Sequence, residues 1–246
     1  MIRTPRGLLL IAALTLGVAL IVTLPARVAY RWAAPEGVAV SGIQGTVWRG
    51  QADAISVSGV YVGDVGWQIK PLRLFTGQAN YHVTGKPASG FIEGNIGVRI
   101  GGKLIVSELA ASLPLNLFAG PLRITGLGGD ASLQFERIEV VDGLPVAADG
   151  TVRVNGLVAP RLSRESIGGY EAEFFTQNNG IAATVEDTDG IVDLAGSLQV
   201  KADRSYQFLG KIAAKPGAPE SLTRQLQYLG SADERGQREL RLEGML

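Results

Sequence analysis

The sequence predicts an all-β protein in which a single N-terminal transmembrane helix precedes one large, antiparallel and strongly curved β-sheet. Three observations lead to this prediction. One long uncharged stretch opens the chain, apolar and polar residues alternate over most of the remainder, and glycine-containing turn dipeptides separate the alternating segments. With 46% hydrophobic and 19% charged residues among 246, the chain can bury a sizeable core. No long linker divides it, so we expect one domain beyond the helix.

The uncharged stretch is long enough for a membrane helix. Residues 8–24 contain no charge, and a bilayer-spanning helix needs about 20 apolar residues, with about 17 as the lower limit. A buried helix of a soluble protein would show a polar face, which this segment lacks. We therefore expect a single-pass transmembrane anchor at residues 8–26.

Flanking charges and candidate cleavage sites decide how the anchor is interpreted. A short basic N-terminus favours a cytoplasmic location for residues 1–7. Residues 27–246 would then lie across the membrane, which in a bacterium means the periplasm. A cleaved signal peptide is the alternative, but its apolar region usually spans only about 7–15 residues. Cleavage after Ala29 would also place Arg27 where a small residue is needed.

Past the anchor, apolar and polar residues alternate with period two, as in strands with one buried and one solvent-exposed face. The clearest examples are residues 65–70, 92–100, 192–201, 206–212 and 239–243. Residues 107–113 could form a helical turn, but their alternation favours a strand, with Pro114 at a bend or an edge. These strands predict a long antiparallel meander.

A phase slip interrupts the alternation at residues 133–140. Leu133 and Phe135 share one parity, whereas Ile138 and Val140 have the other. An extra residue in one strand of a pair explains such a slip, so we predict a β-bulge near Glu136-Arg137.

Glycine-containing dipeptides predict the turns, because type I′ hairpins need positive φ at both central residues. We assign hairpins to Asp142-Gly143, Asp149-Gly150, Asn179-Gly180 and Asp189-Gly190, a longer hairpin loop to residues 202–205 and another turn to residues 126–130.

One short helix is predicted near residues 219–229. Pro219 suits a first helical turn, and Gly230 ends the helix. Three leucines share one face of this helix: Leu222, Leu226 and Leu229.

The last segment, residues 238–246, alternates again, with Leu240, Leu242 and Leu246 on one side. An unpaired strand of this kind is an aggregation hazard. We therefore expect it to pair within the sheet, with its leucines toward the core.

The composition excludes several classes of site and favours none with catalytic chemistry. Lys+Arg and Asp+Glu are equal at 23 each, so no strong field steers the protein to nucleic acid, and the absence of cysteine excludes thiol nucleophiles and cysteine zinc sites. The single histidine, His82, has the parity of solvent-facing residues. Residues 186–190 lack the calcium-loop pattern, and residues 126–130 lack the lysine and hydroxyl residue of a phosphate loop. Glu171 and Glu173 are interpreted as a solvated pair, so we predict no enzyme, no cofactor and no metal site.

A tryptophan between two glycines begins a series of ordered motifs. We interpret Trp48 as a core residue at a strand end, with Gly45 and Gly50 allowing the backbone to turn or approach closely. The motifs are GTVWRG at 45–50, VGW at 65–67 followed by Pro71, Leu72, Leu74 and Gly77, VDGLP at 141–145 leading to GTV at 150–152, YLG at 228–230 and RELRLEG at 238–244.

In this order the motifs resemble the type II secretion system protein N family over nearly the full chain, although residues 161–169 match no part of the family pattern. Seven residues carry the resemblance and are interpreted as structural: Gly45, Trp48, Gly50, Trp67, Pro71, Gly230 and Gly244. The resemblance implies a non-enzymatic accessory protein of the inner membrane that supports export of folded proteins across the outer membrane. Its implied partners are the inner-membrane platform proteins, with the outer-membrane secretin as a further candidate.

A lipid-handling protein is the alternative function. Membrane-anchored proteins similar to the AsmA-like family also combine a short anchor with long glycine-punctuated meanders curved into an apolar groove. A continuous apolar strip open to solvent would favour lipid binding. A concave face plugged by Trp48, Trp67 and Phe135 would favour an interaction scaffold.

Overall fold

The computed structural model describes residues 5–34, 37–70, 78–87, 89–99, 102–160, 163–178 and 180–245. Its helices are α1 (Pro5–Val22), α2 (Ala26–Ala33), η2 (Leu115–Phe118), α3 (Glu220–Leu226) and η3 (Gln227–Leu229). Its strands are β1 (Val38–Ser41), β2 (Gln44–Gly45), β3 (Arg49–Val57), β4 (Val60–Ile69), β5 (Gln78–Lys86), β6 (Phe91–Arg99), β7 (Leu104–Pro114), β8 (Gly128–Val141), β9 (Leu144–Val158), β10 (Tyr170–Gln177), β11 (Gly180–Asp187), β12 (Val192–Lys201), β13 (Ser205–Ala214) and β14 (Arg238–Met245).

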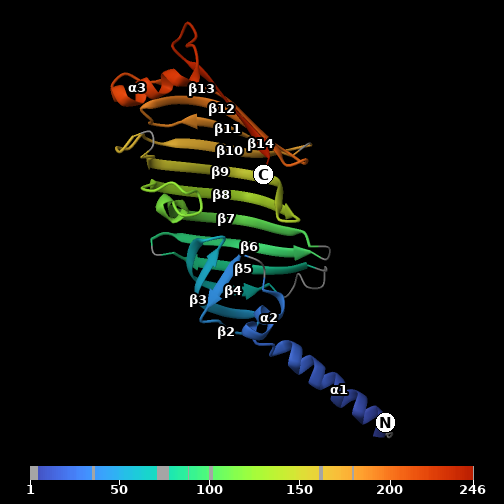
Figure 1. The fold of residues 1–246 in the computed structure, drawn as a ribbon. Coiled ribbons are helices and arrows are strands. Elements are labelled where there is room, and N and C mark those ends of the chain that lie inside the picture. Colours follow the sequence, from blue (N-terminus) through green and yellow to red (C-terminus); the bar gives the residue numbers. More distant parts are fainter. Residues whose placement is uncertain are drawn as a thin grey trace.

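All fourteen strands belong to one open antiparallel sheet, which confirms the predicted β-meander (Figure 1). The hydrogen-bonded order is β1-β3-β4-β5 and so on to β14, each strand beside its neighbour in sequence, and β2 pairs with β3 off this path. Thirteen strands in a row, about 4.8 Å apart, give a span of nearly 60 Å along the curved sheet. α1 leaves the first-strand end, and α3 lies at the opposite end (Figure 1).

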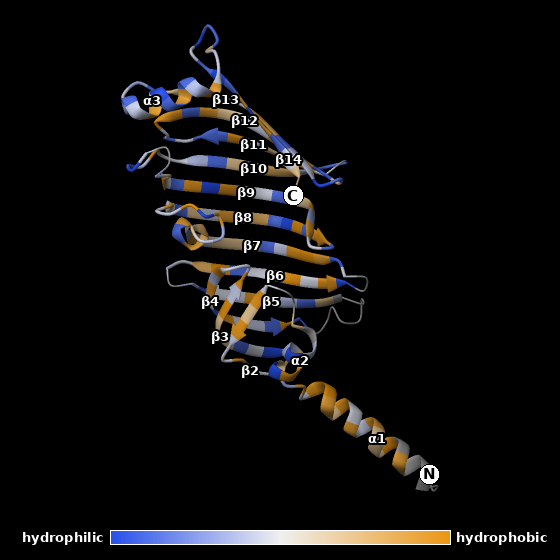
Figure 2. Cartoon of the chain, in the orientation of Figure 1, coloured by the Kyte–Doolittle hydropathy of each residue, from blue (hydrophilic) through white to orange (hydrophobic). Residues whose placement is uncertain are grey.

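α1 projects away from the sheet and is coloured mainly as hydrophobic in Figure 2. Large apolar side chains on it, among them Leu9, Leu14 and Leu16, are exposed. Within the described part of the chain, no helix combines the length and the apolar character needed to cross a membrane. The second helix, α2, was not expected, because residues 26–33 were divided between the predicted anchor and the all-β domain.

One face of the sheet, here called the apolar face, collects the inward side chains of successive strands. A single cross-strand row runs through Leu109, Phe135, Gly150, Phe174, Ala183, Leu198, Phe208 and Leu242. Phe135 in this row forms a buried cluster with Ala148 and Ile181, and the rings of Phe135 and Phe174 lie 5.6 Å apart at a tilted angle. The core is therefore a layer of apolar side chains that extends along one face of the sheet.

The predicted bulge is confirmed, and it has a counterpart on the adjacent strand. Glu136 is the extra residue of β8, since Phe135 pairs with Gly150 and Arg137 with Asp149. β7 carries an extra residue relative to β6 in the same region, and Glu108 there has φ of +52°. The two extra residues face each other, so the β7–β8 ladder keeps its register through both.

The turn predictions succeed where a dipeptide joins two strands. Asp142 and Gly143, at φ of +51° and +77°, connect β8 to β9, and residues 202–204 connect β12 to β13. A hairpin joins β10 to β11, although Asn179 lies outside the described residues. The turn expected at residues 126–130 is shorter, because β8 already begins at Gly128.

One turn prediction was wrong, and the hairpin predicted at Asp189-Gly190 is present with a longer loop than a two-residue turn. Asp149-Gly150 lies inside β9, where a Cβ on Gly150 would approach Phe135 Cα to 2.5 Å, so the glycine permits close packing opposite the bulge. Asp189-Gly190 belongs to a longer β11–β12 loop in which the Asp189 carboxylate accepts the Gly169 N–H at 2.5 Å. Tertiary contacts determine the conformation of both dipeptides, and local sequence does not reveal those contacts.

The C-terminal predictions hold with one correction. α3 and η3 follow Pro219 and end at Gly230, as predicted, and Leu222 and Leu226 are buried. β14 pairs with β13, as expected. Leu242, however, is 52% exposed, because β14 is the edge strand and no other described strand lies on its far side. Leu246 lies outside the described residues.

The facing bulges predict compensation between two deletions. Deleting Glu136 alone, or Glu108 alone, leaves one extra residue without its opposite and shifts the β7–β8 register on one side of the bulge. A one-residue shift turns apolar side chains to the wrong face, at about 1.5–3 kcal/mol for each large side chain. Deleting both residues restores equal strand lengths, so the double variant should unfold in urea at a higher midpoint than either single variant. Additive losses would contradict the facing-bulge arrangement.

Candidate functional site

The junction between the N-terminal helices and the sheet is built on a tight turn that links β2 to β3. The Thr46 N–H donates to the Arg49 carbonyl at 2.9 Å, and the Thr46 hydroxyl accepts the N–H groups of Trp48 and Arg49, both at 3.3 Å. The turn therefore presents Val47 and Trp48 away from the ladder and toward the end of α1.

Two donors of this turn bind one carbonyl group in the last turn of α1 and one just after the helix. Trp48 Nε1 donates to the Ile21 carbonyl at 2.8 Å, and the Val47 N–H donates to the Leu24 carbonyl at 3.0 Å. The last carbonyls of a helix lack partners within the helix, so an indole N–H is a suitable external donor. Pro25 and Thr46 form a bridge beside these bonds. The turn thus holds the exit of α1 against the sheet.

The two glycines of the motif have separate geometric roles. Gly45 has φ of +87°, and a Cβ there would lie 2.5 Å from the Arg49 carbonyl oxygen. A Cβ on Gly50 would lie 2.4 Å from Cζ2 of Trp67 and 2.5 Å from the Gln44 carbonyl oxygen. The ring of Trp67 thus lies across Gly50, and its Nε1 donates to the Thr46 carbonyl at 3.1 Å.

Trp48 lies at a strand end, as expected, because β3 begins at Arg49, but it is not a core residue. It occupies the β2–β3 turn and is half-buried, outside the apolar face. The chain reverses at residues 46–49, because the Thr46 hydroxyl and the positive φ of Gly45 favour a turn where alternation suggested a continuous strand. Trp67 and Phe135, the other two proposed plugs, do lie in strands: Trp67 is half-buried and Phe135 is buried.

Two further motif residues, Gly230 and Gly244, lie near the other end of the sheet. Gly230 follows η3 with φ of +114°. Gly244 pairs with Tyr206, and a Cβ on it would lie 2.8 Å from the tyrosine ring. Pro71 lies outside the described residues.

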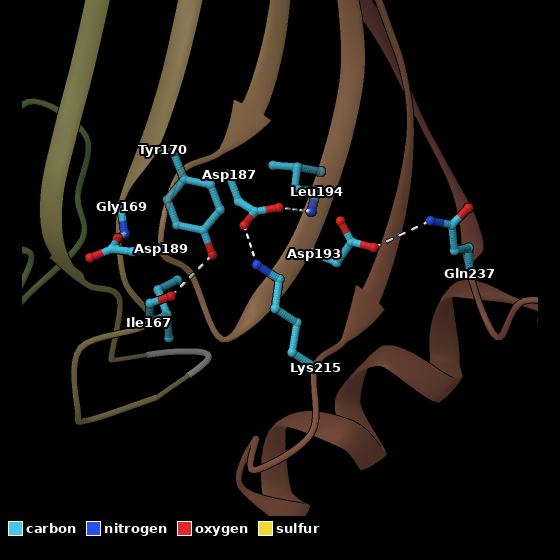
Figure 3. A network of polar contacts seen from close by, with 9 residues as sticks. All are labelled: Ile167, Gly169, Tyr170, Asp187, Asp189, Asp193, Leu194, Lys215 and Gln237. Atoms are coloured by element: carbon cyan, nitrogen blue, oxygen red, sulfur yellow. Dashed lines mark hydrogen bonds and ion pairs between the residues drawn. The ribbon is translucent and has the colours of Figure 1, made fainter.

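A polar cluster fastens the other half of the sheet (Figure 3). Lys215 Nζ binds one oxygen of the Asp187 carboxylate, and the other oxygen accepts the Leu194 N–H at 3.1 Å. Burial acts to raise the pKa of Asp187, but the hydrogen bonds from Lys215 and Leu194 outweigh it and hold that pKa below 3.8. The hydrogen bond to Asp187 in turn raises the pKa of Lys215 above 10.5.

Tyr170 lies beside this ion pair and donates to the Ile167 carbonyl at 3.3 Å. Burial, with the negative charges of Asp187 and Asp189, raises the pKa of Tyr170 to about 12. Residues 186–190 form the end of β11 and the loop after it, and the Asp187 side chain at this end is only 9% exposed. Its parity matches the buried Ile181 and Ala183, so the alternation already indicated an inward carboxylate that needs a cation.

The other titratable residues singled out from sequence do not form a catalytic group. His82 contacts Asn95 at 3.3 Å and Glu93 at 3.5 Å on the neighbouring strand. Glu171 binds Arg153 at 2.8 Å, whereas Glu173 lines a separate hollow. Among the described residues, no three metal-binding side chains gather as ligands would.

That hollow has a volume of about 670 Å³ and lies at the paired bulges. Its lining mixes aromatic residues, including Phe135 and Phe174, with four carboxylates: Glu108, Glu136, Asp149 and Glu173. The Asp149 carboxylate accepts two hydrogen bonds from Thr176, one from its backbone N–H at 2.8 Å and one from its hydroxyl at 3.0 Å. The hollow is a consequence of the bulges and carries mixed polarity.

Replacing Gly50 with alanine tests the ring that lies across it. The new methyl group would collide with the Gln44 backbone and the Trp67 ring, so unfolding free energy should fall by about 1–3 kcal/mol. Gly120→Ala, where a Cβ meets nothing within 4 Å, is the matched control and should stay within about 0.5 kcal/mol of wild type. Chemical denaturation measures both, and equal stability of the two variants would refute the packing role of Gly50.

Trp48→Phe should loosen the junction while the aromatic ring is kept. Loss of the Nε1 bond to Ile21 should cost about 0.5–1.5 kcal/mol locally and speed tryptic cleavage at Arg27 and Arg31. Tyr228→Phe, on a fully exposed ring at the far end, should leave the cleavage rate unchanged. Unaltered cleavage in Trp48→Phe would show that the bond does not hold α1.

The Asp187–Lys215 pair predicts a specific pH dependence. Because the folded pKa of Asp187 is lowered, its stabilisation is complete above the unfolded value of 3.8 and is lost as pH falls through the folded pKa. Asp187→Asn should remove this acid-side dependence and, at neutral pH, cost about 1–2 kcal/mol, a modest value because Lys215 is 38% exposed. Melting temperatures measured from about pH 3 to about pH 7, which includes the range in which carboxylates titrate, check this prediction. Asp142→Asn, at an exposed turn, is the control.

Comparison with known proteins agrees with the order of the motifs. The family model described as type II secretion system (T2SS), protein N, matches residues 36–241. The chain is similar to type II secretion system protein N of Vibrio cholerae serotype O1, at 24% identity over 235 residues, covering 92% of each chain. It is also similar to type II secretion system protein N of Aeromonas hydrophila, at 23% identity over 245 residues, covering 92% of this chain and 93% of the relative. No solved structure matches significantly. The chain therefore belongs to the type II secretion system protein N family.

Proposed function

We propose that this type II secretion component is a non-enzymatic accessory protein held in the inner membrane by residues 8–26. In this proposal residues 1–7 lie in the cytoplasm and residues 27–246 form a periplasmic scaffold that contacts other components of the machine. The exposed apolar surface of α1 and the bonds that Trp48 and Val47 make to its end support an anchor joined firmly to the sheet.

The observation that carries the scaffold role is the free edge of β14. Among the described strands, this eight-residue strand pairs only with β13, and it stands many strands away from the α1 attachment. Leu242 and Met245 on it are exposed. A free strand edge offers unpaired N–H and C=O groups, which a partner can extend as a further strand. We propose that a platform protein or the secretin docks at this edge.

The lipid-handling alternative has less support. Trp48 does not plug the apolar face, but the hollow at the bulges contains four carboxylates, and an acyl chain could not solvate them. Phe135, which lines the same hollow, is buried in its own sheet, as a packed core residue would be. We therefore favour protein contacts over a lipid groove.

The secretion role can be tested in a strain that lacks the gene. Loss of the protein should leave a folded export substrate in the periplasm, and the full chain should restore its release into the medium. A version with residues 1–26 replaced by a cleavable signal peptide should be periplasmic but should not restore release. Full restoration by that soluble version would contradict a need for the anchor.

Site-specific crosslinking tests the docking edge. A photoreactive residue at Leu242 should capture a component of the secretion machine in membranes, because that side chain is exposed at the free edge. The same residue at Phe175, which is also exposed but lies on the central strand β10, is the control. Capture at Phe175 and not at Leu242 would move the proposed interface from the edge to the middle of the sheet.

A further inference from the structure

We infer that α2 lies in the headgroup layer of the membrane, where Arg27 and Arg31 bind phospholipid phosphates and Trp32 inserts beside them. The inference rests on the proposed anchoring by α1. It adds a lipid-binding surface outside the anchor, and that surface would set how the sheet stands on the membrane.

The inward side of α2 is fixed to the sheet. Ala26 is buried, and Tyr30, one turn further on, donates its hydroxyl hydrogen to the Val38 carbonyl at 2.9 Å. The Pro25 carbonyl accepts the N–H groups of Val28 and Ala29 at 3.0 and 3.3 Å, which starts the helix directly after the bridge to the β2–β3 turn. α2 therefore has one defined outward side.

That outward side carries two cations and one large aromatic ring. Arg27 and Arg31 are four residues apart and so occupy one helical face, and both are exposed. Trp32 is 77% exposed, although burying an indole is strongly favourable. No carboxylate in the described part of the chain forms an ion pair with either arginine; Glu36 lies outside those residues.

The position of α2 in the chain favours lipid over a protein partner. Residues 23–25 alone separate it from α1, and three residues reach at most about 11 Å. The headgroup layer on each side of the hydrocarbon core is about 5–8 Å deep, so α2 cannot leave the vicinity of the surface if α1 enters the bilayer. Because Trp48 and Val47 bind the end of α1, the segment between the helices is also held in one geometry.

The side chains match the chemistry of that layer. Guanidinium groups bind phosphate oxygens through paired N–H donors, which two arginines on one face can offer to neighbouring headgroups. Tryptophan prefers the boundary between headgroups and acyl chains, because its ring is apolar and its N–H is polar. A short helix with this division of side chains lies in the interface plane.

The test uses the full chain in vesicles of phosphatidylethanolamine, with and without phosphatidylglycerol, whose acyl chains carry bromine either near the headgroup or near the bilayer centre. Bromine quenches tryptophan at short range, and the chain has only three tryptophans. Shallow bromine should quench the wild type more than deep bromine does, and Trp32→Phe should lose most of that quenching. The double variant Arg27→Gln/Arg31→Gln should lose the extra quenching that phosphatidylglycerol produces. Arg224→Gln/Arg235→Gln, an equal charge change on exposed residues at the far end, is its matched control.

Since the chain has no cysteine, a fluorophore on Leu14→Cys reports insertion of α1 independently. If this fluorophore is in the bilayer and Trp32→Phe is quenched as strongly as wild type, the headgroup position of α2 is refuted while the anchor stands. If the glutamine pair keeps its full response to phosphatidylglycerol, the role of the arginines is refuted. A fluorophore left in water refutes the anchor, and Trp32 quenching in that case would assign membrane contact to α2 alone.

Discussion

The apolar face has to stay on one side from β7 to β14, and the register of each ladder decides whether it does. Side chains alternate with period two, so a one-residue error anywhere would turn every following apolar residue outward. The facing extra residues Glu108 and Glu136 show how the sheet handles such an error. Each alone would shift a ladder, and opposite each other they cancel between β7 and β8 while the chain bends.

Strand identity and order could be predicted from sequence because they depend on local signals. Alternation located most strands, and the phase slip between Phe135 and Ile138 located a bulge to within two residues. What failed depended on distant contacts. Gly150 resembles a turn glycine but lies in a strand, where it allows Phe135 to pack closely. Trp48 resembles a strand residue, but its indole N–H donates to a helix carbonyl 27 residues earlier.

The residues of the candidate site could be predicted from sequence to a similar extent. Glycine and tryptophan in the order of a family motif marked the junction, but nothing local showed that the indole N–H reaches the end of α1. The inward position of Asp187 could be predicted from its parity in the alternating segment. Its partner Lys215 lies 28 residues away, beyond β12 and β13. Sequence could therefore indicate that the carboxylate needs a cation without identifying which one.

Aromatic rings lie across glycines near both ends of the sheet. Trp67 covers Gly50 close to the α1 attachment, and Tyr206 covers Gly244 on the last strand. In a sheet, a glycine contributes no side chain of its own to packing, and a neighbouring ring restores the lost contact. β3 and β14 are thus each reinforced by a side chain from the strand next to them.

The attachment of α1 also determines how the molecule would respond to tension. Hydrogen bonds in a ladder run perpendicular to the strands, so a pull between the membrane end and β14 loads every ladder in series, and the shortest would open first. The β1–β3 ladder has only four residue pairs. Trp48 and Val47, however, join α1 to the start of β3 directly. A pulling force on the anchor is therefore transmitted directly to β3 and does not load the short β1–β3 ladder.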